Sequence, residues 1–388
     1  MAKPPDPVEL SQALIRCPSV TPENAGVLDV LEEALEGIGF VCERMLFSEA
    51  GEKDVDNLYA KLGTQGPNFC FGGHTDVVPV GDAEAWTHDP FGGVIEGGVL
   101  YGRGANDMKS AVAAFAAAAA RFAGERGSDF GGTISMLITN DEEGPSVNGT
   151  RKVLDALAER NERLDAALIG EPTNPYEMGE MIKIGRRGML NGWITVNGKQ
   201  GHTAYPHLAD NPIHHLAAML SAITDEPIDE GSEHFQPTVL QITTIDVGNP
   251  AMNVIPAKAT AAFNSRYNDL HTGDSLAGLL RERLDRVAEA RGASYEFRYD
   301  GRADSFLTPP GDLSALVAQA VEGHVGRKPD LTTTGGSSDA RFFKDHCPVV
   351  EFGLVGRTMH QVDEQVEVAH IRALTDIYKT VLDGFFPG

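Results

Sequence analysis

One stretch of the chain sets the pattern for the rest: Phe69-Cys70-Phe71-Gly72-Gly73-His74-Thr75-Asp76. The apolar run from Asn68 to Phe71 is typical of a buried strand, and we expect the two glycines to end it. His74 and Asp76 then follow, two residues apart. In such a pair the imidazole can bind a metal ion while the carboxylate holds its other N–H. An ordinary loop histidine fits this short pattern as well, so the interpretation depends on residues further along the chain.

The composition narrows the class of protein. Of the 388 residues, 41% are hydrophobic and 23% are charged, which is typical of a globular chain with room for two domains. Acidic residues outnumber basic ones by 56 to 32, and the net charge of −24 repels phosphate backbones. Such a surface also lacks the basic face of a membrane-binding protein. We therefore expect neither nucleic acid nor a membrane as a partner.

The N-terminal residues, the apolar runs and the cysteines indicate where in the cell we expect the protein. The run from Met1 to Pro7 lacks the apolar segment of a signal peptide. No stretch approaches the ~18 apolar residues that indicate a transmembrane helix. The four cysteines are scattered and form no Cys-X-X-Cys pair: Cys17, Cys42, Cys70 and Cys347. We expect them to be reduced thiols in the core of a cytoplasmic protein.

Strand–turn–helix units recur, and several predicted strands run into charged residues. The strand 133–139 leads to Asp141-Glu142-Glu143, and the strand 166–169 leads to Gly170-Glu171. Because ligands of α/β proteins bind beyond the carboxyl ends of the strands, we expect such loops to meet at one edge of a sheet. Four loops follow this pattern, those beginning at His74, Asp107, Glu142 and Glu171. For Asp141, a structural role in the turn and a catalytic role are both open.

The pattern changes in the middle of the chain. Residues 188–299 alternate predicted strands and helices in the order βαββαβ, which is typical of an open-faced α+β sandwich. The first pattern returns after residue 300. The sequence therefore predicts one discontinuous α/β domain, residues 1–187 and 300–388, with a smaller domain inserted at 188–299.

Collected together, the charged side chains at the predicted strand ends suit a catalytic metal site: His74, Asp107, Glu142, Glu143, Glu171 and the late His360. Histidines and carboxylates without cysteine are typical of zinc, or a similar divalent ion, in a catalytic site. The set exceeds the ligands of one tetrahedral ion and fits two ions about 3.5–4 Å apart with a bridging carboxylate. In the adjacent pair Glu142-Glu143, one carboxylate can bind metal while the other moves protons.

Six motifs resemble, in order, those of the M20 family of metallo-amidohydrolases: His74-Thr75-Asp76-Val77-Val78-Pro79, Gly102-Arg103-Gly104-Ala105-Asn106-Asp107-Met108-Lys109, Asp141-Glu142-Glu143-Gly144, Gly170-Glu171-Pro172-Thr173, Gly201-His202-Thr203-Ala204-Tyr205-Pro206-His207 and Met359-His360. The resemblance runs from near Leu10 to near Tyr378. It implies an α/β catalytic domain of the zinc-peptidase type with a mixed sheet. It also implies that the inserted α+β domain is a lid that forms a homodimer.

The resemblance implies a role for each metal-ligand candidate. His74 and Glu171 would bind one zinc ion, Glu143 and His360 would bind the other, and Asp107 would bridge both. Cobalt or manganese would substitute in part, because imidazole and carboxylate ligands are not strongly selective.

Catalytic roles are implied in the same way. Glu142 would act as general base and then as general acid, and Asp76 would orient His74. His202 would reach the site of the partner subunit and stabilise the oxyanion. The peptide bond between Asp107 and Met108 would be cis.

The resemblance implies contacts with the carboxylates of the substrate for Arg187, Asn253 and Arg266, and the glycine-rich turn with Gly336 and Ser337 is expected to bind substrate through backbone N–H groups. Arginine suits carboxylates because it binds them in a bidentate manner, and a glycine-rich turn offers backbone N–H groups. One position departs from the family. Its members often carry asparagine four residues before the final histidine, where this chain has Gly356 followed by Arg357. The substrate contact from that loop is therefore left open, with Arg357 as an alternative.

The resemblance implies hydrolysis of a small N-acyl amino acid. The expected substrate is N-succinyl-LL-2,6-diaminopimelate, cleaved to succinate and LL-2,6-diaminopimelate. A related deacylase that acts on N-acetyl substrates, or a dipeptidase, is the alternative among enzymes. A metal-binding or ligand-binding protein without catalysis is the alternative from another class, and the presence of Glu142 beside Glu143 argues against it.

Overall fold

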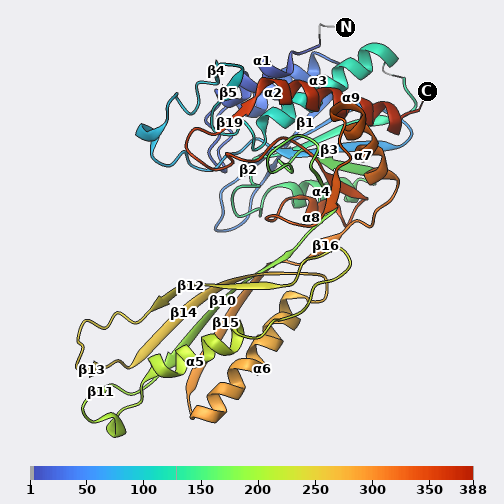
Figure 1. Cartoon of the computed structure of the whole chain (residues 1–388). Helices are drawn as coiled ribbons and strands as arrows, with labels where there is room; N and C mark the ends of the chain where they lie inside the picture. Colours follow the sequence, from blue (N-terminus) through green and yellow to red (C-terminus); the bar gives the residue numbers. More distant parts are fainter. Residues whose placement is uncertain (1–3, 128, 388) are drawn as a thin grey trace. The chain divides into compact units, whose positions relative to one another are not determined.

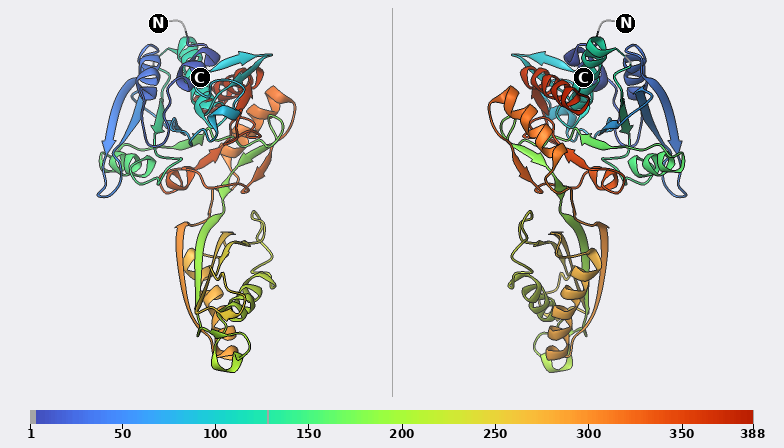
Figure 2. Two further views of the ribbon diagram at one scale, coloured as in Figure 1. Left: turned by 90° about the vertical axis from the view of Figure 1, so that its left-hand side faces the viewer. Right: turned by 90° about the vertical axis from the view of Figure 1, so that its right-hand side faces the viewer.

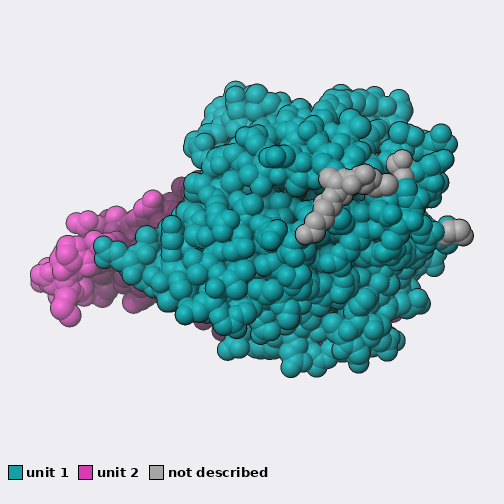
Figure 3. Space-filling view, turned by 90° about the horizontal axis from the view of Figure 1, so that it is seen from above, with its two compact units in different colours: residues 1–184, 308–332, 338–388 teal, residues 185–307, 333–337 magenta. Residues whose placement is uncertain are grey.

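The computed structural model describes residues 4–127 and 129–387, and Figure 1 shows its elements. The chain divides into two compact units, which are coloured separately in Figure 3: unit 1 comprises Met1–Ile184, Thr308–Thr332 and Ser338–Gly388, and unit 2 comprises Gly185–Leu307 and Thr333–Ser337. The expected boundary at residue 300 falls inside β15 (Ser294–Ala303), and the expected boundary at residue 187 falls just after the division between Ile184 and Gly185. Residues 1–3, where the expected absence of a signal peptide partly falls, lie outside the described residues.

Unit 1 contains an eight-stranded sheet in the order β1-β2-β6-β3-β7-β18-β8-β17. β6, β3, β7 and β18 are parallel to one another, as are β8 and β17, whereas the pairs β1–β2, β2–β6 and β18–β8 are antiparallel. The expected mixed sheet is thus confirmed. Its strands are β1 (Val41–Phe47), β2 (Val55–Gly63), β3 (Asn68–His74), β6 (Thr133–Thr139), β7 (Ala166–Ile169), β8 (Met181–Lys183), β17 (Asp330–Thr332) and β18 (Val349–Glu351).

A separate three-stranded sheet in unit 1 has the order β19-β5-β4, formed by β4 (Val94–Glu96), β5 (Val99–Tyr101) and β19 (Gln365–Glu367). The helices of unit 1 are α1 (Pro7–Ile15), α2 (Val27–Glu36), η1 (Ala83–Ala85), α3 (Lys109–Arg126), α4 (Thr150–Glu159), α7 (Asp312–Val325), α8 (Ala340–Phe343) and α9 (Val368–Phe385). Among the described residues, no helix combines the length and the apolar character needed to cross a membrane.

The central helix α3 is buried along most of its length. Every residue from Ala111 to Ala120 is buried, and small alanine side chains allow α1, α9 and β3 to approach closely. Phe71 of β3 stacks on Phe115 of α3 with ring centroids 4.4 Å apart, and Tyr378 of α9 meets both rings edge-on. This aromatic cluster fixes β3, and with it the histidine at the end of the strand.

The expectation that Gly72 and Gly73 end the strand is wrong, because β3 continues through both glycines to His74. A Cβ atom on Gly72 would lie 2.4 Å from Cδ1 of Ile169, and one on Gly73 would lie 2.7 Å from Cε of Met108. Glycine is needed here for close packing of neighbouring chain segments rather than for a turn.

Unit 2 contains an antiparallel sheet in the order β12-β14-β10-β15, with α5 and α6 on the same face of it (Figure 2). Apolar residues alternate along β10 and point to this face, where they pack with the helices. The expected βαββαβ order is confirmed. The remaining elements are β9 (Gly185–Arg186), β10 (Gly188–Asn197), β11 (Gly201–His202), η2 (Pro206–Leu208), α5 (Pro212–Thr224), β12 (Val239–Asp246), β13 (Val254–Ile255), β14 (Lys258–Tyr267), α6 (Gly273–Arg291) and β16 (Phe306–Leu307).

Replacing Phe115 by alanine tests whether the aromatic cluster holds β3. Removing a buried aromatic side chain leaves a cavity, and such changes cost about 3–5 kcal/mol of unfolding free energy. We expect urea to unfold unit 1 at a correspondingly lower concentration. Val41→Ala is the control, because Val41 is 73% exposed and its truncation should change stability by less than ~0.5 kcal/mol. An equally small effect of Phe115→Ala would contradict a packing role for the cluster.

Candidate metal centre

Three adjacent parallel strands of the large sheet deliver charged side chains to one edge. His74 is the last residue of β3, Glu142 and Glu143 follow β6, and Glu171 follows β7. Asp107 reaches the same place from a different sheet, because its loop connects β5 to α3. The four loops therefore meet at one edge of the large sheet, as expected, although the loop of Asp107 arrives from the smaller sheet.

Asp107 lies between two histidines. Nε2 of His74 is 3.3 Å from Oδ1 of Asp107, and Nε2 of His360 is 3.1 Å from Oδ2. On the outer sides, His74 Nε2 lies 3.8 Å from Glu171 Oε1, and His360 Nε2 lies 2.9 Å from Glu143 Oε1. Each half of the cluster thus combines one histidine, one glutamate and one oxygen of Asp107.

The donor set fits divalent cations. Within this cluster, two groups of three residues have ligand atoms within 4.8 Å of one another: His74 with Asp107 and Glu143, and His74 with Glu142 and Glu171. Nε2 of His74 and Oδ1 of Asp107 are buried without a hydrogen-bond partner among the described residues. Buried polar atoms without partners are costly, so a cation that binds both atoms would remove this cost.

Asp76 supports the cluster through both its main chain and its side chain. Nδ1 of His74 lies 2.9 Å from the backbone carbonyl oxygen of Asp76 but 3.7 Å from its carboxylate. The carboxylate instead accepts the backbone N–H groups of Glu142, at 3.3 Å, and of Glu143, at 3.1 Å. The main chain of Asp76 therefore contacts the imidazole, and its side chain holds the adjacent glutamates in place.

Burial and crowded charges shift the pKa values of the cluster. Burial raises the pKa of Glu142 well above its usual range, and the charge of Glu171 adds to the rise. Burial also opposes ionisation of Asp107, but the close imidazoles of His360 and His74, at 3.1 and 3.3 Å, outweigh it and hold the pKa of Asp107 below its usual range. Hydrogen bonds to Asp107 and Glu143 raise the pKa of His360 to about 10. Both histidines must lose a proton before they can bind a metal ion.

Asp141 has a structural role in the turn after β6. Its carboxylate accepts three successive backbone N–H groups, those of Ser146, Val147 and Asn148.

Arg357 lies exposed in the loop that carries His360, and no ion pair involves it among the described residues. The peptide bond between Asp107 and Met108 is cis, as the resemblance implied.

The other expected site residues belong to unit 2: Arg187, His202, Asn253, Arg266, Gly336 and Ser337. His202 and Asn253 are neighbours, because β11 pairs with β13 and places His202 opposite Val254. Nδ1 of His202 accepts the N–H of Ala204 at 3.0 Å. With Nδ1 as acceptor, a neutral imidazole carries its proton on Nε2, so His202 presents a donor on an exposed side chain.

Arg187 directly precedes β10, and Arg266 lies on the neighbouring strand β14, where the register pairs Met189 with Arg266. Burial lowers the pKa of both guanidinium groups, and the charge of Arg187 lowers that of Arg266 further. Nε of Arg187 is buried and unpaired within the described part of the chain. Two cations that repel each other in a partly desolvated place favour an anionic ligand.

Sequence reasoning missed three buried charged residues beside the cluster: Arg103, Lys109 and Glu364. Nζ of Lys109 donates to the carbonyl groups of Leu14 and Cys17, at 3.0 and 2.8 Å, and so anchors the start of α3 next to Asp107. Arg103 and Lys109 lie inside a sequence motif from which only Asp107 was selected as a site residue. Glu364 lies in a polar loop with no periodicity that would mark it as buried.

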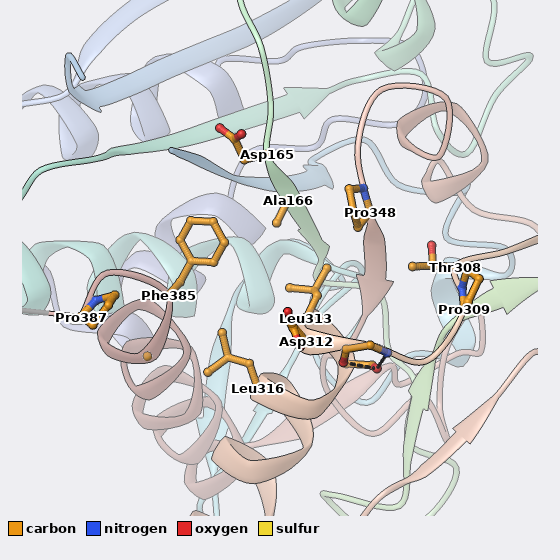
Figure 4. A pocket seen from close by; sticks show the side chains of 13 residues that line it. Asp165, Ala166, Thr308, Pro309, Asp312, Leu313, Leu316, Pro348, Phe385 and Pro387 are labelled. Atoms are coloured by element: carbon orange, nitrogen blue, oxygen red, sulfur yellow. Dashed lines mark hydrogen bonds between the residues drawn. The ribbon is translucent and has the colours of Figure 1, made fainter. Parts of the chain in front are cut away.

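A pocket of about 600 Å³ lies elsewhere in unit 1 (Figure 4). Its wall includes Asp165 and Ala166 at the amino end of β7 and Pro348 just before β18. The candidate ligands follow the carboxyl ends of the strands, so this apolar pocket is distinct from the metal centre.

Comparisons with curated proteins identify relatives of this chain. The sequence profile described as peptidase family M20/M25/M40 matches residues 70–384. A succinyl-diaminopimelate desuccinylase of Rhodospirillum centenum is 60% identical over 384 residues, which cover 99% of this chain and 98% of the relative. A protein of the same name from Parvibaculum lavamentivorans is 56% identical over 387 residues, covering 100% and 97%.

Solved structures share the fold at lower identity. The aminopeptidase PepT of Bacillus cereus has a TM-score of 0.78 at 20% identity and is covered to 97%, as is this chain. A dinuclear metal-binding M20 peptidase of Bacillus subtilis has a TM-score of 0.68 at 16% identity, covering 97% of this chain and 96% of its own. The profile match spans most of the chain and the curated relatives match nearly all of it; the chain therefore belongs to the peptidase M20 family.

Proposed function

We propose that this protein hydrolyses the amide bond of N-succinyl-LL-2,6-diaminopimelate to give succinate and LL-2,6-diaminopimelate. The observation that carries the proposed chemistry is the carboxylate of Asp107, which directs one oxygen to each of two histidines inside a cluster of glutamates. The choice of substrate is supported by curated relatives named succinyl-diaminopimelate desuccinylase, which are 53–60% identical over nearly their full length.

In this proposal the cluster holds two zinc ions, with cobalt or manganese as partial substitutes. His74 and Glu171 hold one ion, Glu143 and His360 hold the other, and Asp107 bridges them. When bound, such ions polarise the amide carbonyl and favour ionisation of water. The half-exposed side chain of His360, with 46% of its surface accessible, leaves this side of the cluster open to a ligand.

Glu142 is the proposed proton carrier. The Asp76 carboxylate accepts its backbone N–H at 3.3 Å and so fixes its main chain. Its raised pKa suits a carboxyl group that takes a proton from the attacking water and gives it to the leaving amine.

Residues of unit 2 are proposed to bind substrate. The expected substrate carries several carboxylates, and the cationic pair Arg187 and Arg266 suits such anions. Asn253, Gly336 and Ser337 complete the proposed contacts. The backbone carbonyl of Gly336 accepts a hydrogen bond from Arg186 at 3.2 Å, which supports an ordered turn at this position.

We propose a homodimer that forms through unit 2, in which His202 completes the site of the partner subunit. The edge strand β12 supports a contact with a second copy, because Val239 and Ile245 are 42% and 59% exposed on it. The exposed Nε2 donor of His202 suits stabilisation of an oxyanion. The free state of all four cysteines suits a cytoplasmic location.

The first test is a substrate panel. We expect the zinc-loaded protein to release succinate from N-succinyl-LL-2,6-diaminopimelate faster than it releases acetate or amino acids from N-acetyl-ornithine or dipeptides. The control is Glu142→Gln, which should retain both ions but lose roughly 10²–10⁴-fold in kcat, the usual scale of general acid–base catalysis. Faster cleavage of the acetyl or dipeptide substrates would reject the proposed substrate. Loss of metal from Glu142→Gln would instead make Glu142 a ligand.

Metal binding should release protons. Because the pKa of His360 is raised to about 10, its imidazole is protonated at pH 7 in the metal-free protein and must deprotonate to bind an ion. We expect two zinc ions per chain, with affinity that increases as the pH rises from 6 to 8. Titration calorimetry in buffers of different ionisation enthalpy measures the released protons. Saturation at one ion per chain, or binding without proton release, would contradict the prediction.

Mixed dimers test the role of His202. His202→Ala should lower kcat by roughly 10²–10³-fold, as expected for loss of an oxyanion donor, without changing the metal content. Mixing this variant with Glu142→Gln under subunit exchange should restore part of the activity, because a mixed dimer has one site with both residues intact. Each variant exchanged with itself is the control. A verified mixed dimer without activity would place His202 outside the partner's site.

A further inference from the structure

A fully buried ion pair, Arg103 and Glu364, lies next to two of the loops that carry candidate ligands. Nη1 of Arg103 is 2.7 Å from Oε2 of Glu364, and the two side chains are 2% and 0% exposed. Arg103 precedes Asp107 by four residues, and Glu364 follows His360 by four. The two loops also lie at the same end of the β5–β19 pair, because Tyr101, which ends β5, pairs with Gln365, which begins β19.

Glu364 holds the loop that contains Asp107. Its Oε1 accepts the backbone N–H of Asn106 at 3.1 Å and that of Asp107 at 3.2 Å. Its backbone carbonyl accepts the N–H of Gly102 at 2.9 Å. A carboxylate from the His360 loop therefore fixes the main chain at the proposed bridging ligand.

Arg103 holds the loop that contains His360. Its Nη1 donates to the carbonyl of Gln361 at 3.2 Å, directly after the histidine. Its Nη2 donates at 3.3 Å to the carbonyl of Pro79, in the segment that follows His74. His360 has a φ of 63°, a left-handed conformation that residues other than glycine rarely adopt, so its loop needs support from outside.

We infer that Arg103 and Glu364 form a reciprocal clamp that sets the separation of Asp107 and His360 and thereby the affinity for the ion on the His360 side. The inference rests on the proposed two-ion site. Each member of the pair holds the main chain of the loop that supplied the other, so a change in one side chain releases both loops. Neither side chain is one of the proposed ligands, and both are positioning residues.

A role in stability alone is the competing explanation. Buried ion pairs can often be replaced by apolar side chains of similar volume without loss of stability, whereas removal of one partner leaves a buried charge unpaired. A single substitution therefore changes both the positioning of the loops and the balance of buried charge. Replacing both residues by methionine removes both charges together but also removes the acceptor for the Asn106 and Asp107 amides. The double variant thus separates positioning from charge balance.

The experiment measures zinc affinity in the metal-free protein by competition with a chromophoric chelator. In Glu364→Gln we expect one of the two zinc affinities, assigned to the ion on the His360 side, to fall by about 10–100-fold, the usual effect of losing an outer-sphere partner, while the other changes less. In Arg103→Met with Glu364→Met the same affinity should remain low. Excess zinc should restore most of kcat in both proteins.

Two control variants accompany the measurement. Asp376→Asn breaks the exposed pair of Asp376 with Arg121, 2.7 Å apart in the same unit, and should leave both affinities unchanged. Leu382→Ala truncates a fully buried side chain of α9 and should lower thermal stability without affecting zinc affinity. If Leu382→Ala lowered zinc affinity as much as Glu364→Gln, general destabilisation would explain both decreases. That result would overturn the clamp.

Hydrogen exchange provides a reading that needs neither activity nor metal. The amides of Asn106 and Asp107 should exchange faster in metal-free Glu364→Gln than in the wild type. Glu364→Asp, whose shorter side chain cannot reach both Arg103 and the amides, gives the same test if Glu364→Gln fails to fold. Unchanged exchange together with two unchanged zinc affinities would overturn the clamp. A wild-type protein that binds fewer than two ions would instead overturn the proposed two-ion site.

Discussion

Repulsion among four carboxylates is the constraint on which the rest of unit 1 depends. Asp107, Glu142, Glu143 and Glu171 surround two histidines at the end of three parallel strands; Asp107 and Glu171 are buried, and Glu142 and Glu143 are partly buried. Like charges at such distances are tolerated only where protons or cations compensate them. The neighbouring carboxylates raise the pKa of both histidines, for His74 against the effect of burial, and the histidines in turn lower the pKa of Asp107. Bound metal ions would take over this compensation.

The surrounding structure keeps the crowded groups from separating. Phe71 and Phe115 fix the strand that ends at His74, and the glycines before it let Met108 and Ile169 pack against the strand. The carboxylate of Asp76 holds the main chain of the glutamate pair, and Glu364 holds that of Asp107. These contacts are hydrogen bonds to backbone groups, so they set the positions of the ligands without competing for the ligand atoms.

The two units contribute different chemistry. Unit 1 provides the histidines and the carboxylates of the cluster, whereas unit 2 carries exposed or partly buried cationic and donor groups such as Arg187, Arg266 and His202. A substrate with several carboxylates and one scissile amide needs both kinds of group. In the proposed enzyme, recognition of the acid groups and activation of the amide are therefore divided between the units.

Sequence by itself determined much of this protein: the strand that leads to His74, the βαββαβ order of the insert and the short motifs that carry the candidate ligands, because each depends on local periodicity or on a few adjacent residues. Tertiary structure alone decided the rest. It placed Asp107 in a loop from a second sheet, turned the expected strand-ending glycines into packing positions, and buried Glu364 against Arg103 across 261 residues of chain. Contacts between segments so far apart leave no periodic trace in the sequence. The substrate, too, follows from likeness to relatives rather than from any local pattern, because specificity depends on side chains that only the fold brings together.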